Sequence, residues 1–208
     1  MVAQRLLPDA AGLQHAAALL AAGEVVAFPT DTVYGVGCRW DDDAALDRLF
    51  ALKRRPRERR VPILVHGLDD AVDLELVVDQ RATCLASRFW PGPLTVVLPA
   101  SAPGAETLAV RAPDHAVALA LLRLTGPLRV TSANVSGFPE AIRADEVLKE
   151  FATSDLLAAV VDGGESPGGT ASSIVDLSVD PPRLLRAGPV SAEALAGCIG
   201  PVATDARR

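Results

Sequence analysis

The sequence predicts an α/β protein, a single domain in which helices flank one twisted, mixed β-sheet. Three observations lead to this prediction. Segments with helical spacing of apolar residues alternate with short apolar runs typical of buried strands along the whole chain. No internal repeat or linker-like change of composition divides the 208 residues. Half of the residues are hydrophobic but only 4% are aromatic, so the core is expected to consist mostly of Ala, Val and Leu.

Helices and strands are predicted to alternate through the first half of the chain. Asp9 is an N-cap candidate for a helix that ends near Ala22, with Gly23 as its stop. A short strand, "EVVAF", ends at Pro29, and "TDTVYGVG" is a loop that returns to a second strand. The further elements expected in this half are a helix over 41–53, a strand over 61–66, a helix over 80–89 and, after a rigid "WPG" turn, a strand that reaches residue 98.

The second half continues the same mixture. The segment "PLRVTSAN" is predicted as a strand that delivers a polar cluster at its end. The domain is expected to span residues 1–200, and residues 201–208 are expected to form a flexible C-terminal tail. The other expected elements are strands over 106–113, 157–164, 171–178 and 182–188, and helices over 114–124, 144–151 and 191–198.

Cysteine usage and hydropathy exclude several classes of protein. Cys38, Cys84 and Cys198 are far apart, odd in number and form no CxxC pair, so we expect neither a disulfide nor a structural zinc site. Glu24 interrupts the apolar run near the N-terminus, and no uncharged stretch reaches the roughly 20 residues that span a bilayer. The expected location is therefore the reducing cytoplasm, without a signal peptide and without membrane contact.

Positive charge is concentrated in "KRRPRERR", residues 53–60. This segment carries six basic residues and one acidic residue, or +5, so a chain of net charge -6 carries -11 over its remaining residues. An acidic protein is not a general nucleic-acid binder, and a local positive patch favours one defined anionic ligand. The alternative is a solvated helix end, where cations complement the helix dipole.

Polar clusters occur where predicted strands end. The chain has no GxxxxGK[ST], GxGxxG, HExxH or GxSxG motif. The clusters are "PTDTVYG", "KRRPRERR", "VTSANVSG" and "GGESPGGTASSIVD"; taken singly, they could be a turn, a solvated helix end, a helix cap and a mobile loop. Together they supply the Lys, Arg, hydroxyl and amide groups that bind a polyphosphate. Because ligands bind at strand ends in open α/β sheets, we expect these clusters to share one site.

Seven motifs occur along the chain in a fixed order. They are "FPTDTVYGVG", "LKRRP" followed by "VPILVH", "WPGPLTVVL", "LAVRAPDH", "TSANVSG", "ASSIVD" and "LLRAGP". This set resembles the YrdC-like family, the threonylcarbamoyl-adenylate synthases of tRNA modification. The resemblance extends from residue 23 to about residue 195 and is to the single-domain members. Arg54 departs from the small residue frequent at its position, and Val61 departs from a common Asn.

The resemblance implies a YrdC-like fold with a concave, positively charged cleft, and a specific reaction. Such enzymes convert L-threonine, bicarbonate (or carbon dioxide) and ATP into threonylcarbamoyl-AMP and pyrophosphate, for the threonylcarbamoyladenosine next to the tRNA anticodon. ATP is a substrate, Mg²⁺ is expected on its phosphates, and no protein metal ligand is expected. By similarity, the catalytic pair is Lys53 and Arg55, the nucleotide group adds Arg57, Ser132, Asn134 and Arg186, and the threonine group is Thr30, His66, Arg111, Thr131 and Ser172.

The resemblance also implies partners and leaves alternatives. The unstable product is expected to pass to downstream proteins that transfer the threonylcarbamoyl group to tRNA. One alternative is a module that binds tRNA or double-stranded RNA with the same basic cleft, although the basic run lacks interleaved aromatic residues. Another is the carbamoyl-transfer module of hydrogenase-maturation proteins. His66 has the alternative of a strand-end histidine bonded to backbone, and Tyr34 and Trp90 are expected to pack.

Overall fold

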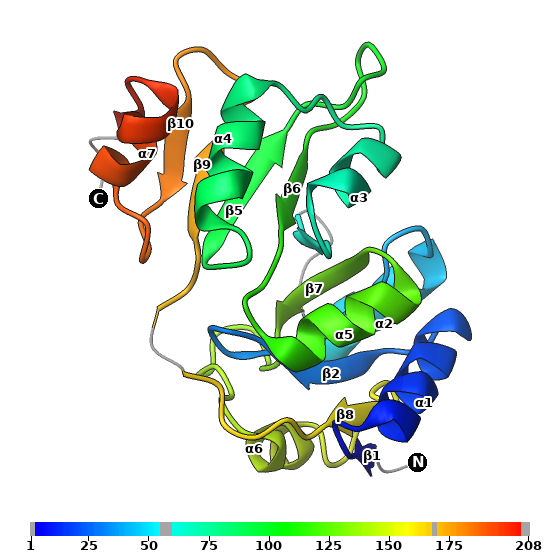
Figure 1. Cartoon of the computed structure of the whole chain (residues 1–208). Coiled ribbons are helices and arrows are strands. Elements are labelled where there is room, and N and C mark those ends of the chain that lie inside the picture. Colours follow the sequence, from blue (N-terminus) through cyan, green and yellow to red (C-terminus); the bar gives the residue numbers. More distant parts are fainter. Residues whose placement is uncertain (1–2, 55–59, 168–169, 205–208) are drawn as a thin grey trace. The chain divides into compact units, whose positions relative to one another are not determined.

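The computed structural model describes residues 3–54, 60–167 and 170–204. The chain divides into two compact units, each made from two separate stretches of sequence. Unit 1 comprises Met1–Val61 and His115–Gly169, and unit 2 comprises Pro62–Asp114 and Thr170–Arg208. Both units combine strands with helices (Figure 1), in agreement with the α/β prediction.

Unit 1 contains a mixed sheet. Among the described residues, its strands follow the order β1-β8-β2-β3-β7. Strand β8 is parallel to both β1 and β2, whereas β3 is antiparallel to both β2 and β7. Helices α1 and α5 pack against each other. The elements of unit 1 are β1 (Gln4–Leu6), α1 (Ala10–Ala21), β2 (Val26–Pro29), β3 (Tyr34–Arg39), α2 (Asp43–Lys53), α5 (Ala116–Thr125), β7 (Leu128–Ser132), α6 (Ala144–Glu150) and β8 (Ala159–Val161).

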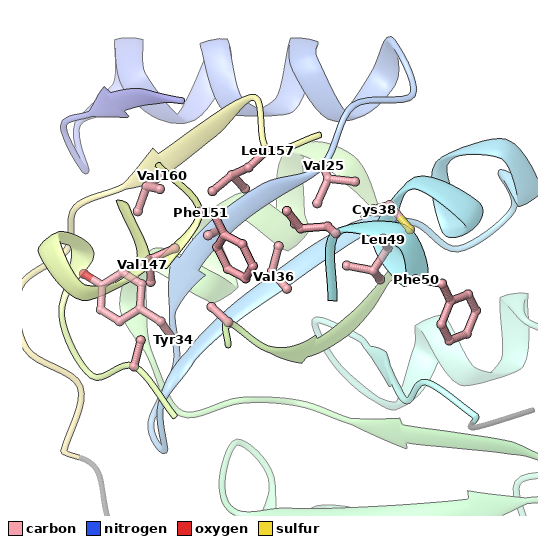
Figure 2. Close-up of a cluster of buried hydrophobic side chains, with 14 of the residues drawn as sticks. Val25, Tyr34, Val36, Cys38, Leu49, Phe50, Val147, Phe151, Leu157 and Val160 are labelled. Atoms are coloured by element: carbon pink, nitrogen blue, oxygen red, sulfur yellow. The ribbon is translucent and has the colours of Figure 1, made fainter. Parts of the chain in front are cut away.

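The core of unit 1 is built from small and branched side chains, as the low aromatic content predicts. Strands β2 and β8 are buried along their whole length. Figure 2 shows the rings of Tyr34 and Phe151 in a cluster that also contains Val36, Val147 and Leu157. All five side chains are at most 4% exposed, so each contributes close to its full burial free energy, about 1.5 to 3 kcal/mol for an aliphatic or Phe side chain.

Helix α1 begins and ends at the predicted residues. The Asp9 carboxylate accepts a hydrogen bond from the Gly12 amide (2.8 Å), which satisfies one of the free amides of the first turn. At the other end, Gly23 has φ of +78°, and the amides of Gly23 and Glu24 donate to carbonyls of the last turn. This is the Schellman arrangement, in which a left-handed residue closes the helix and glycine fits without strain.

Unit 2 is also built on a mixed set of strands. The order is β4-β6-β5-β9-β10-β11. The pairs β4/β6, β5/β9 and β10/β11 are parallel, and β5/β6 and β9/β10 are antiparallel. Helices α4 and α7 pack against each other. The elements of unit 2 are β4 (Ile63–Leu64), α3 (Leu68–Asp73), α4 (Gln80–Phe89), β5 (Leu94–Leu98), β6 (Leu108–Arg111), β9 (Ser173–Asp176), β10 (Arg183–Arg186), α7 (Ala192–Ile199) and β11 (Ala203–Thr204).

The structure corrects two predictions in unit 2. Cys84 of α4 and Cys198 of α7 form a disulfide, with Cα atoms 6.1 Å apart. The two residues are 114 positions apart in the sequence, so their spacing gave no indication of this pairing. Residues 203–204, expected in a flexible tail, form β11 beside β10; residues 205–208 lie outside the described ranges. No helix in the described ranges combines the length and apolar character that spanning a bilayer needs.

Replacing Arg54 with glycine is expected to stabilise the protein. Arg54 is the C-cap of α2 and has φ of 49° and ψ of 41°, a left-handed conformation that costs a residue with a Cβ about 1 kcal/mol. A positive φ also occurs at Glu75, with φ of 57°, after α3. Arg54→Gly and Glu75→Gly should therefore each raise the free energy of unfolding by about 0.5 to 1 kcal/mol in urea titrations. A lower unfolding free energy for both variants would contradict this account of the two turns.

Candidate functional site

In unit 1, a buried lysine is hydrogen-bonded to two of the predicted nucleotide-binding residues. Lys53 is the last residue of α2 and is only 2% exposed. Its ammonium group donates to the carbonyl of Ser132, to the carbonyl of Asn134 (2.8 Å) and to Asn134 Oδ1 (3.3 Å). Its own carbonyl accepts from the Ser136 amide (3.1 Å). The end of α2 is therefore fixed to the segment after β7, and these oxygen acceptors orient the positive charge.

Asn134 holds the segment after β7 in one shape. Its Oδ1 accepts from the Ser132 hydroxyl (2.6 Å), and its Nδ2 donates to the Phe138 carbonyl (2.6 Å). Asn134 is 6% exposed, so the cost of breaking these buried bonds favours a single conformation. The structure thus brings together Lys53, Ser132 and Asn134, three residues of the predicted nucleotide group. Arg55 and Arg57, from the same group, lie outside the described residues.

Thr30 and Thr131 of the predicted threonine group also lie in unit 1. The Thr30 hydroxyl donates to the Val33 carbonyl (2.7 Å) and accepts from the Thr32 and Val33 amides. It is therefore engaged in the turn between β2 and β3, as the structural alternative for this cluster predicts. Thr131 lies in β7 opposite Val36 of β3 and is half-buried.

Tyr34 connects this turn to the glycine segment that follows β8. It is fully buried, as the packing prediction requires, and its hydroxyl donates to the Gly164 carbonyl (2.7 Å). Burial, with a smaller contribution from the charge of Asp162, raises the pKa of Tyr34 to about 12. The neutral phenol is thus the form that the folded protein stabilises.

Tyr34 offers a direct spectroscopic test because it is the chain's one tyrosine. Tyrosinate absorbance of the folded protein should rise near pH 12, against an ordinary pKa of 10.0 for the phenol. Since the pKa is raised on folding, the stabilisation is complete below pH 10 and is lost between pH 10 and 12. Titration of the urea-unfolded protein is the control. A folded-state midpoint near 10 would contradict the burial of the phenol.

In unit 2, Arg111 is a buried cation at the end of β6. It is 7% exposed, and its Nε donates to the Gly92 carbonyl (3.0 Å). The Gly92 amide in turn donates to the Ala112 carbonyl (2.9 Å), so the "WPG" turn fixes the plane of the guanidinium group. A guanidinium group oriented in this way has the planar geometry that recognises a carboxylate.

His66 lies two residues beyond Leu64, the residue of β4 that pairs with Arg111. The amide of Val65 donates to the Arg111 carbonyl (2.9 Å), and the His66 amide donates to Asp70 Oδ2 (2.6 Å). The His66 side chain is half-buried and lines a cavity of about 300 Å³ together with α4 and Trp90. The Trp90 indole N–H donates to the Leu94 carbonyl (2.7 Å), in agreement with a packing role.

Ser172 and Arg186 lie on the side of β5 opposite to β6 and are hydrogen-bonded to each other. Arg186 Nε donates to the Ser172 carbonyl (2.8 Å), and Arg186 Nη2 donates to Ser172 Oγ (3.0 Å). The Ser172 hydroxyl also shares a hydrogen bond with Thr95 Oγ1 (2.8 Å). A residue of the predicted threonine group is therefore in contact with one of the predicted nucleotide group.

Sequence reasoning missed two residues that support this contact. Thr95 belongs to a predicted buried strand, and nothing in "LTVVL" distinguishes it from core. A Cβ at Gly188 would lie 2.5 Å from the Ser173 amide nitrogen and 2.6 Å from the Ala171 carbonyl oxygen. The "RAG" segment can pack against residues 171–173 only because position 188 carries no side chain. This glycine within "LLRAGP" was the feature of the sequence that could have indicated the close packing.

The comparisons with known proteins agree with the motif-based prediction. The family model Sua5_yciO_yrdC, described as "Telomere recombination", matches residues 18–188. A Bacillus subtilis (strain 168) protein named threonylcarbamoyl-AMP synthase is 40% identical over 204 residues, which cover 93% of this chain and 58% of that protein. A Vibrio cholerae protein of the same name is 39% identical and covers 79% of this chain, with 92% of its own length matched.

Solved structures confirm the fold. The structure of Pyrococcus abyssi Sua5 complexed with L-threonine superposes with a TM-score of 0.86 at 34% identity, covering 98% of this chain and 62% of that one. The chain thus spans about three fifths of the length of the Bacillus subtilis and Pyrococcus abyssi proteins. The predicted mixed α/β fold and the predicted family are both confirmed: the chain belongs to the Sua5/YciO/YrdC family.

Proposed function

We propose that the protein is an L-threonylcarbamoyladenylate synthase. It combines L-threonine, bicarbonate or carbon dioxide, and ATP to give threonylcarbamoyl-AMP and pyrophosphate. The names of the relatives and the threonine complex of Pyrococcus abyssi Sua5 support this proposal. The structural observation that carries it is the buried Lys53 ammonium group, held against Ser132 and Asn134. A preoriented cation of this kind suits a ligand with concentrated negative charge.

The reaction requires positioning and charge stabilisation more than a covalent nucleophile. The threonine amine attacks carbon dioxide, forming an N–C bond and losing a proton to give a carbamate. A carbamate oxygen then attacks the α-phosphorus of ATP, and the bond from that phosphorus to the bridging oxygen breaks to release pyrophosphate. Charge develops on phosphate oxygens during this displacement, so fixed cations lower the barrier.

The proposal assigns the residues to two groups. For the nucleotide we propose Lys53, Ser132, Asn134 and Arg186, together with Arg55 and Arg57 outside the described ranges. For threonine we propose Arg111 as the fork on the carboxylate, with Thr30, His66, Thr131 and Ser172 around the rest of the amino acid. The Thr30 hydroxyl already donates to the Val33 carbonyl and accepts from the Thr32 and Val33 amides, so its contribution would come through its methyl group.

Mg²⁺ enters the proposal as part of the substrate. The described residues contain no group of three or more His, Cys, Asp or Glu side chains placed to hold a metal ion. Mg²⁺ that is bound by phosphate oxygens and water needs no such group. The ion would screen the phosphate charge while the side chains of this chain orient the reacting atoms.

The product implies a place in tRNA modification. A threonylcarbamoyl group activated as a mixed anhydride with AMP is suited to transfer onto an adenosine amine. We therefore propose downstream transfer proteins and a cytoplasmic site of action, where ATP and tRNA are present. The tRNA-binding alternative is not favoured, because the relatives carry the name of a synthase.

The decisive experiment measures pyrophosphate release from ATP, with threonine and bicarbonate each omitted in turn. The synthase should release pyrophosphate only when both are present. Release that does not depend on threonine would overturn the proposal. Steep weakening of tRNA binding with salt, without threonine-dependent turnover, would favour the RNA-binding alternative instead.

A further inference from the structure

Thr95 has a buried hydroxyl group that is hydrogen-bonded to Ser172, a residue of the proposed site. It lies in β5, where every residue is buried, and is 2% exposed. Within the described part of the chain, the side-chain partner of its hydroxyl is Ser172 Oγ, at 2.8 Å. A buried hydroxyl that leaves its proton without an acceptor loses about 1 to 3 kcal/mol. Ser172 is buried as well, at 4% exposed, and the geometry of the pair fits a proton on either oxygen. A bound substrate would give Ser172 an acceptor outside the pair, and with Thr95 as the donor both protons are then satisfied.

The direction of this bond decides what Ser172 can do. Ser172 Oγ has one proton and two lone pairs. Arg186 is always a donor, so the bond from Nη2 occupies one lone pair. If Thr95 donates, it occupies the second lone pair, and the Ser172 proton is directed to a third group. If Ser172 donated to Thr95 instead, the Ser172 hydroxyl proton would be used in that bond and would not be available to the substrate.

We propose that Thr95 is a positioning residue that makes Ser172 a hydrogen-bond donor to an acceptor oxygen of the substrate. The inference rests on the proposed function, in which Ser172 belongs to the threonine group. Thr95 does not touch the substrate. It acts through Ser172, and the same arrangement keeps the Ser172 carbonyl and hydroxyl in place for Arg186.

Strand pairing makes this position suitable for such a role. Strand β5 is parallel to β9, with Leu94 opposite Ser173 and Thr95 opposite Ile174. The Ser173 amide donates to the Pro93 carbonyl (2.9 Å), and the Ser173 hydroxyl donates to the Val190 carbonyl (2.7 Å). The backbone next to Ser172 is thus fixed, and the rotation of its hydroxyl is the remaining freedom that Thr95 controls.

The test replaces the Thr95 hydroxyl by a methyl group and follows the Michaelis constants. Thr95→Val should raise the KM for threonine about five- to tenfold, the scale of one hydrogen bond. Thr95→Ser, which keeps the donor, should behave like the unmodified protein. A purely structural role would lower the melting temperature and the folded fraction, and hence the apparent kcat, without changing the KM for threonine.

A double-mutant cycle with Ser172→Ala makes the test specific. Once Ser172 has lost its hydroxyl, Thr95→Val should have no further effect on the KM for threonine. Thr125→Val is the matched control, because the Thr125 hydroxyl donates to the Leu121 carbonyl within α5 of unit 1. It should leave the KM unchanged. Thr95→Ala replaces Thr95→Val in the same cycle if the valine variant does not fold.

The outcomes separate this inference from the proposed function. If the unmodified protein shows no threonine-dependent pyrophosphate release, the proposed function fails before any variant is compared. If it is active and Thr95→Val leaves the KM for threonine unchanged, the positioning role is wrong. Multiplicative effects of Thr95→Val and Ser172→Ala, or failure of Thr95→Ser to restore the KM, would also overturn it.

Discussion

Lys53→Ala should reduce threonine-dependent pyrophosphate release at least about 100-fold, the scale expected when one electrostatic interaction is removed from a transition state. Two effects combine in this reduction. The variant removes a buried positive charge, and it leaves the oxygens of Ser132 and Asn134 without the ammonium group that donates to them. Buried acceptors without a donor favour a rearrangement of the segment, so both charge and shape change.

A second substitution distinguishes charge from geometry. Lys53→Arg keeps the charge, but a planar fork cannot reproduce an ammonium group that donates to converging acceptors at a site 2% exposed. It should restore less than about a tenth of the original activity. The chain's other lysine, Lys149, is exposed on α6, and Lys149→Ala is the control with unchanged activity. Activity of Lys53→Ala within about tenfold of the unmodified protein would remove Lys53 from the catalytic group.

Arg111→Ala should raise the KM for threonine by about 10- to 100-fold, with a smaller change in the KM for ATP. A hydrogen bond to a charged group contributes about 1.5 to 3 kcal/mol, which corresponds to this range. The guanidinium group is already oriented by its bond to the Gly92 carbonyl, so little side-chain freedom is given up when the carboxylate binds.

The measurement is steady-state pyrophosphate release as a function of threonine at saturating ATP. Arg111→Lys should give an intermediate KM, because an ammonium group provides charge without the bidentate geometry. Arg183→Ala, at an exposed position of β10, is the matched control and should not change the KM. An unchanged KM for threonine in Arg111→Ala would mean that the amino-acid pocket is elsewhere.

Features that depend on neighbouring residues could be predicted from the sequence. Asp9 and Gly23 mark the ends of α1 through their own side chain and their own conformational freedom. The mixed α/β class follows from the alternation of apolar patterns, and the motif order identified the family. Lys53 and Asn134 were assigned to one group by resemblance, and the structure places them in hydrogen-bond contact.

Features that depend on residues distant in the chain could not be predicted. The disulfide of Cys84 with Cys198 needs two helices to meet, and spacing alone does not show that. Strand β1 is three residues long and is defined by its pairing with β8, where Gln4 lies opposite Ala159. Thr95 looks like any residue of a buried strand until its hydroxyl is seen beside Ser172. Composition gives no sign of the division into two units.

The way the chain alternates between the two units has a consequence for its synthesis on the ribosome. Unit 1 needs residues up to 169, and unit 2 needs residues from 62 to beyond 170, so neither is complete when the first half of the polypeptide has emerged. Strand β8, which joins β1 to β2, is among the last parts of unit 1 to be made. Strand β2 can pair with β3 soon after synthesis, but its other edge stays unpaired until β8 has been made, and unpaired strand edges are prone to aggregation.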